Sequence, residues 1–142
     1  MADNVDAILV EFERLKQACQ DMAEKKIVVG IIGGGEVAKI AHIHEYGDGK
    51  MPERSFLRAS FDADQDKLNG IVTAQVTKVL AGRTTADAAA NAIGAQGAQL
   101  LQHYIDNNRV TPPSDFSKKT QHTTLYETGT HIRDRIAFKV EG

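Results

Sequence analysis

Two halves of different character meet at Glu45-Tyr46-Gly47-Asp48-Gly49-Lys50-Met51-Pro52-Glu53-Arg54-Ser55-Phe56-Leu57-Arg58. Upstream lie a short β-branched run and three consecutive glycines, and downstream lie two long amphipathic stretches. Gly47 and Gly49 can adopt a positive φ at little steric cost, which suits a sharp reversal. Pro52 fixes its own φ and favours extended geometry at the residue before it. The stretch 47–55 is therefore predicted to be a stiff elbow that leads into a helix.

The end of this elbow has the residues expected at a helix start. Ser55 is the predicted N-cap, and Phe56 occupies the first apolar position after it. Arg54 and Arg58 flank Phe56 and could reach carboxylates on this chain or on a neighbouring one. The plainer alternative is a loop-to-helix junction with no further role, since loops more often connect than act.

Length and composition suit one soluble domain over residues 1–142. The chain has 142 residues and a formal net charge of -2, and its charges are interspersed. No Lys/Arg block occurs, so strong sequence-independent binding to duplex nucleic acid is not indicated. Cys19 is the single cysteine and is expected to be a core residue of a protein in a reducing compartment. No signal-peptide pattern and no membrane-spanning apolar run is present, so no membrane association is expected.

Hydrophobic periodicity predicts the order of the elements. A helix is expected over 5–24, capped by Asp3 or Asn4, followed by a strand over 27–32 and a helix over 36–46. A hairpin strand remains the alternative for 36–46, because its apolar residues also alternate. Helices are then expected over 56–81 and 86–107, a loop over 108–124, and a C-terminal turn and strand over 125–141.

These elements predict an α+β fold in which long amphipathic helices pack on a small, mainly antiparallel β-sheet, because the strands do not follow βαβ order. The last strand is the natural partner of strand 27–32. Helix 86–107 contains Gly94 and Gly97, and interior glycine costs about 1 kcal/mol relative to alanine. Close approach of another helix backbone is the expected compensation.

One local pattern resembles a dinucleotide-binding fingerprint. Gly33-x-Gly35-x-x-Ala38 follows a predicted strand and precedes a predicted helix. Glu36 would place negative charge beside the phosphates, and no later βαβ units follow. A dinucleotide-binding enzyme that uses Gly33 to Ala38 is therefore kept only as an alternative function of a different class.

No pattern in the sequence argues for catalysis, a cofactor or a metal. His42, His44 and Glu45 make an incomplete ligand set, so structural roles are expected for them. The acidic residues that follow Phe61 are read as a solvated helix flank. The sequence also has no nucleophile elbow and no phosphate-binding Walker loop. We therefore expect a protein that is not an enzyme.

Two groups of motifs, taken together, resemble the neck and tail-completion proteins of tailed bacteriophages. The first is an alanine-containing stretch ending in Glu45-Tyr46-Gly47, followed by Met51-Pro52-Glu53-Arg54-Ser55-Phe56-Leu57-Arg58. The second is Pro112-Pro113, Lys118-Lys119-Thr120 and Leu125-Tyr126-Glu127-Thr128-Gly129-Thr130-His131-Ile132-Arg133. The chain departs from the family pattern at Ser55, where a second proline is common, and at His131, where leucine is usual.

The resemblance implies a structural virion protein that forms a homo-oligomeric, hexameric ring, completes the tail and joins it to the head connector. The implied partners are copies of itself, the head connector or stopper, and tail-tube or terminator proteins, with DNA only passing through the lumen. The implied location is the virion neck or tail, and the host cytoplasm during assembly. A tail terminator or tube-associated protein is the alternative within this class. The motif residues carried over are Glu45, Gly47, Pro52, Arg54, Phe56, Arg58, Thr128, Gly129 and Arg133.

Overall fold

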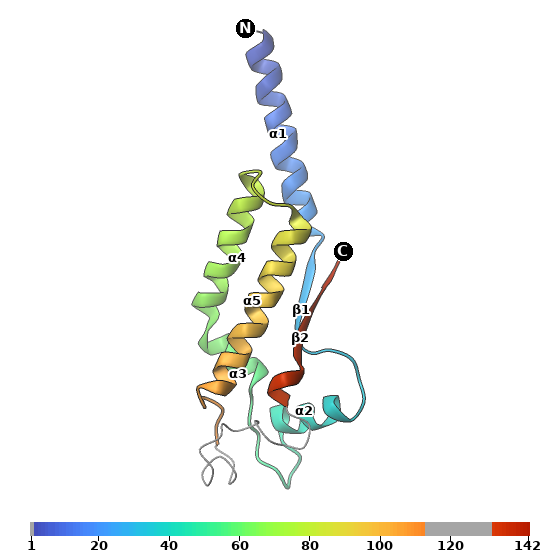
Figure 1. Ribbon diagram of the computed structural model, residues 1–142, viewed down its shortest axis with the longest axis vertical. Coiled ribbons are helices and arrows are strands. Elements are labelled where there is room, and N and C mark those ends of the chain that lie inside the picture. The colour runs from blue at the N-terminus through green and yellow to red at the C-terminus, as the bar shows by residue number, and fades with distance from the viewer. Residues whose placement is uncertain (1, 113–131) are drawn as a thin grey trace.

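The computed structural model describes residues 2–112 and 132–142, and it has the α+β architecture that the sequence predicts (Figure 1). Helix α5 lies between helix α4 and a two-stranded sheet, and helix α1 extends beyond the α4–α5 hairpin. The elements in chain order are α1 (Ala2–Ala23), β1 (Lys26–Ile31), α2 (Glu36–Tyr46), α3 (Leu57–Ala63), α4 (Gln65–Leu80), α5 (Ala86–Asp106), the 3₁₀ turn η1 (Ile132–Arg135) and β2 (Ile136–Glu141).

The sheet pairs the two strands that the sequence predicts as partners. β1 and β2 are antiparallel, with Ile27 opposite Val140 and Val29 opposite Phe138. Side chains alternate between the faces of a strand, so Val29 and its neighbours two residues away share one face. This face packs against α5.

The glycines inside α5 allow this packing, but not in the predicted way. A Cβ on Gly97 would lie 3.3 Å from the Val29 Cγ2 atom, and one on Gly94 would lie 2.8 Å from the Phe138 Cγ atom. The expectation of a close helix backbone is therefore wrong. Side chains of the two strands fill the space that the missing Cβ atoms leave.

Segment 36–46 is the helix α2 rather than the alternative hairpin strand. Ala41 and His44 are buried on the predicted side of this helix, whereas His42 is exposed. The segment is a helix rather than a strand because Ile40, Ala41 and His44 share one helical face that packs towards the core.

The predicted helix 56–81 is divided into α3 and α4 at Asp64, which corrects the sequence prediction. Asp64 has φ -107° and ψ 23°, outside helical values. Its carboxylate is buried and accepts two 3.0 Å hydrogen bonds from the Arg109 guanidinium. Asp64 is therefore not part of a solvated flank.

The predicted ends of the long hairpin are confirmed. Gly82 has a φ of 73° just after α4, and the Arg83 N–H donates to the Lys78 carbonyl at 2.9 Å. This closes α4 as a glycine-terminated helix end. Thr85 caps α5 by accepting a 3.1 Å hydrogen bond from the Ala88 N–H.

Helix α1 differs most from its sequence prediction. It begins at Ala2, so neither Asp3 nor Asn4 is its cap. Cys19 is exposed, contrary to its expected place in the core. The side chains of Val5, Ile8, Leu9, Val10 and Phe12 are 57–70 % exposed. The N-terminal half of α1 therefore carries an apolar surface that its own chain does not cover.

The main core joins the two halves of the chain. Phe56 is fully buried, as are Leu101 and Ile105 of α5. Ile132 and Ile136 of the C-terminal segment complete the same cluster. The core thus depends on the elbow placing Phe56 against α5.

The fit between α5 and β2 generates a prediction for two glycines. Gly94→Ala should lower the free energy of unfolding by roughly 1–3 kcal/mol, because the new Cβ would overlap the Phe138 ring. Gly70→Ala, in α4 with open space around it, should instead raise stability by up to about 1 kcal/mol. Urea denaturation of both variants checks this, and equal effects would contradict the packing described.

Candidate functional site

Several of the residues that carry the family resemblance meet at the carboxylate of Glu45, near the end of α2. Its Oε2 atom accepts hydrogen bonds from the backbone N–H groups of Phe56 at 2.9 Å and Leu57 at 3.0 Å. Its Oε1 atom accepts from the Arg58 N–H at 3.0 Å. The first N–H groups of a helix have no partner inside that helix. Glu45 therefore caps α3 from another helix, an arrangement we term the Glu45 junction (Glu45, Ser55, Phe56, Leu57 and Arg58).

The predicted N-cap role of Ser55 is wrong in detail. The N-cap residue is Phe56, and its side chain makes no capping bond. The Ser55 hydroxyl donates to Glu45 Oε1 at 2.8 Å and accepts from the Ala59 N–H at 3.1 Å. Ser55 thus supports the cap, while the carboxylate of Glu45 supplies it.

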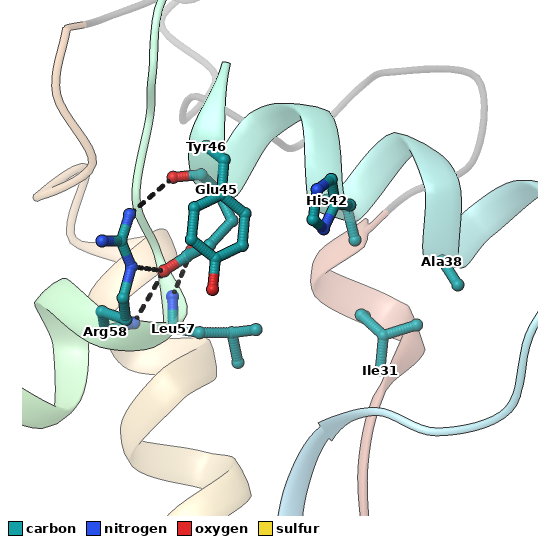
Figure 2. Close-up of a pocket in the computed structure, with 8 residues that line it drawn as sticks. Ile31, Ala38, His42, Glu45, Tyr46, Leu57 and Arg58 are labelled. Carbon is teal, nitrogen blue, oxygen red and sulfur yellow. Dashed lines mark hydrogen bonds and ion pairs between the residues drawn. The ribbon is translucent and has the colours of Figure 1, made fainter. Parts of the chain in front are cut away.

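Arg58 lies against Glu45 (Figure 2), and its side chain is 49 % exposed. Its Nε donates to Glu45 Oε1 at 2.9 Å, and a terminal nitrogen donates to the Glu45 carbonyl at 2.9 Å and to Glu53 Oε1 at 2.8 Å. Its guanidinium lies 4.5 Å from the centre of the Tyr46 ring, within cation–π range. The expectation that Arg58 reaches carboxylates of its own chain is confirmed.

The Glu45 carboxylate is only 2 % exposed, yet it remains ionised. Burial raises the pKa of Glu45, because a charge is costly away from water. The N–H groups of Arg58, Leu57 and Phe56 and the Ser55 hydroxyl outweigh this effect and lower the pKa to about 2. The buried negative charge is therefore a stable part of the fold.

The elbow has the backbone geometry that its glycines predict. Gly47 has a φ of 74° and Gly49 a φ of 88°. A Cβ on Gly47 would lie 3.0 Å from the Met51 carbonyl oxygen and 3.1 Å from the Glu53 nitrogen. The Asp48 carboxylate accepts hydrogen bonds from the next turn of backbone, including the Met51 N–H at 2.8 Å. The elbow is thus a tight turn held at both ends.

Other predicted site residues lie apart from the Glu45 carboxylate. The Arg54 Nε donates to the Pro112 carbonyl at 2.8 Å, and Arg133 makes a two-pronged contact with Asp106 at 2.9 Å. Pro52 is exposed. Thr128 and Gly129 lie outside the described residues. The structure therefore brings Glu45, Gly47, Phe56 and Arg58 together, whereas Arg54 and Arg133 secure other segments.

His44 is buried beside the junction. Burial lowers its pKa, and the nearby positive charge of Arg54 lowers it further. Among residues 2–112 and 132–142, no group of three or more His, Cys, Asp or Glu side chains is arranged to hold a metal ion. Within the same ranges, no helix is long and apolar enough to cross a bilayer.

A pocket of about 330 Å³ lies beside the junction (Figure 2). Its lining is formed by Ile31, Ala38, Ala41, His42, Glu45, Tyr46, Leu57 and Arg58. Glu45 and Arg58 already bind each other there, so their charges are largely satisfied within the chain.

The glycine-rich turn has a different setting from a dinucleotide site. Gly33 and Gly35 have positive φ, and the turn leads from β1 to α2 as the fingerprint requires. However, the strands in the described part of the chain pair antiparallel. The fingerprint operates at the end of a parallel βαβ unit.

The buried Asp64–Arg109 pair and the capping role of Glu45 were both missed at the sequence level. Asp64 and Arg109 are 45 residues apart, and no local pattern connects them. Glu45 was recognised only as a motif residue.

Comparison of this chain with known protein families, with curated proteins and with solved structures finds no match.

The Glu45 junction predicts unequal roles for two carboxylates that bind the same arginine. Glu45→Ala should lower the free energy of unfolding by roughly 3 kcal/mol, because it leaves several buried N–H groups without an acceptor. Glu53→Ala should lower it by less than about 1 kcal/mol, because the Glu53 side chain is 55 % exposed. Urea denaturation measures both values, and equal losses would contradict the capping role.

The lowered pKa of Glu45 also predicts a pH dependence. Its pKa is about 2 in the folded chain and about 4.5 ordinarily. At about 1.4 kcal/mol per pH unit, this difference contributes roughly 3 kcal/mol to the free energy of unfolding. This stabilisation is fully present above pH 4.5 and is lost as the pH falls towards 2. The stability difference between the native chain and Glu45→Gln should therefore shrink over this range. A difference that stays constant with pH would count against the assignment.

Proposed function

We propose that this chain is a structural protein of the tailed-phage neck, which completes the tail and joins it to the head connector as a closed ring. The proposal comes from the ordered set of motifs between Glu45 and Arg133. The observation that carries it further is the Glu45 junction, because the motif residues Glu45, Phe56 and Arg58 act together as one structural unit. A junction that fixes three segments and satisfies its own charges suits a structural scaffold.

The surface of α1 supports an assembling protein. Ile8 is 67 % exposed and Phe12 is 63 % exposed, although both are large apolar side chains. Contiguous exposed apolar residues commonly mark contact surfaces between proteins. A subunit of a ring needs such surfaces, since each copy must bind the next through different patches.

The charge of the chain is compatible with a conduit for DNA. The formal net charge is -2, and no basic block is present to retain the phosphate backbone. A ring built from such subunits would let DNA pass through its lumen, while its protein partners bind its two ends.

The proposal predicts a defect in particle assembly. Deleting the gene from the phage or prophage that encodes it should give filled heads and separate tails in electron micrographs, with loss of infectivity. Supplying the native chain from a plasmid should restore joined particles. Normal infectious particles without the protein would refute the proposal. Tails of uncontrolled length, instead of unjoined tails, would assign it to the tail-terminator class.

A further inference from the structure

Helix α1 carries a seam of apolar residues with the spacing of a coiled coil. The spacing alternates between three and four residues along Val5, Ile8, Phe12, Leu15, Cys19 and Met22. These are successive a and d positions of a heptad repeat, which helices use to pack against one another. The N-terminal half of the seam extends beyond the rest of the chain (Figure 1).

The seam is separate from the side of α1 that contacts its own chain. An Arg14 terminal nitrogen donates to the Leu80 carbonyl at 2.8 Å, and Ala18 and Asp21 line the same contact with the α4–α5 turn. At about 100° per residue, this contact lies roughly 110° around the helix from the seam. Cys19 on the seam is exposed, which agrees with this separation. The N-terminal half of the seam and Cys19 therefore remain exposed while α1 stays attached, whereas Leu15 and Met22 are half-buried.

The charges beside the seam favour the same helix of a second copy as its binding partner. Glu11 occupies a g position and Lys16 the following e position, five residues later. In parallel helices these are the positions that pair between neighbouring chains. Glu11 now pairs with Arg14 on its own helix, but both side chains are exposed and such a pair is easily exchanged.

We propose that the α1 seams of two neighbouring copies pack against each other in parallel, as a pair of helices in a coiled coil. Rotation about a cyclic axis keeps all the helices pointing the same way along it, so a ring supplies the parallel alignment that the Glu11–Lys16 pairing requires. The inference deepens the proposed function and rests on it for the ring, although self-association through α1 can be tested alone.

Disulfide cross-linking through the native Cys19 can test the seam without any substitution. It occupies an a position, so parallel seams bring the Cys19 thiols of neighbouring chains together. Mild oxidation should therefore give a disulfide-linked pair of chains on a non-reducing gel. The matched control is Cys19→Ser combined with Gln20→Cys, because Gln20 is also exposed but lies off the seam. Linkage of the control to the same extent would overturn the inference.

Two substitutions distinguish packing through the seam from non-specific hydrophobic association of α1. Ile8→Asp should weaken self-association at least about tenfold in light scattering or native mass spectrometry, whereas Val10→Asp should weaken it less than about threefold. Val10 is 70 % exposed but faces away from the seam, so it is a matched control. Equal effects would show that α1 does not pack through the seam.

A charge exchange tests the parallel direction. Glu11→Lys and Lys16→Glu should each weaken association, and the double variant should restore it. Failure of this restoration would overturn the parallel arrangement. A different arrangement would insert α1 into the apolar groove of a neighbour, which is lined by Ile27, Phe61 and Val72 among others. In that case Val72→Asp would weaken association and Cys19 would stay unlinked. This result would overturn packing of seam against seam.

The inference and the proposed function fail in different ways. A native ring that persists with Ile8→Asp and without Cys19 linkage would remove the role of the seam and leave the neck proposal standing. Conversely, Cys19 linkage in the purified chain, together with normal head–tail joining after deletion of its gene, would support the seam and refute the neck proposal. A native chain that is monomeric at all concentrations would contradict both.

Discussion

The structure depends on one buried carboxylate that belongs to one helix and completes another. Glu45 lies in the last turn of α2, yet its oxygens accept the first N–H groups of α3. The elbow between the two helices is tight enough to allow this because Gly47 adopts a positive φ where a side chain would crowd the backbone. Phe56 is placed by the same geometry in the core against α5. A single charge therefore couples the direction of the chain, the start of a helix and the packing of the core.

The junction and the α1 seam suit an assembling protein in complementary ways. The junction satisfies its own charges within the chain, and it fixes the relative positions of α2, α3 and the core. The seam leaves large apolar side chains in water. A rigid body with one unsatisfied surface can add copies without rearranging, since the cost of ordering the subunit has already been met on folding. Both features suit the structural role that we propose.

Local patterns predicted most elements but not their long-range partners. Thr85 and Gly82 mark helix ends through interactions only a few residues away, so their sequence signals sufficed. Asp64 was misread because its partner, Arg109, is 45 residues away. Cys19 was misread because an apolar stripe indicates which side of a helix prefers to be covered, not whether the same chain covers it. Predictions that fall on Thr128 and Gly129 lie outside the described residues.

The sequence by itself determined the strand 27–32, its antiparallel partner, the two ends of α5 and the position of the elbow, whereas it left 36–46 open between helix and strand and did not show the break at Asp64. These follow from periodicity, glycine conformation and proline stiffness, all of which act over neighbouring residues. Only the tertiary structure decided that Glu45 caps α3, that strand side chains fill the space beside Gly94, and that the N-terminal half of the α1 seam stays exposed. Those outcomes depend on which surfaces meet in space, because hydrogen bonds and close packing act over a few ångströms whatever the separation along the chain.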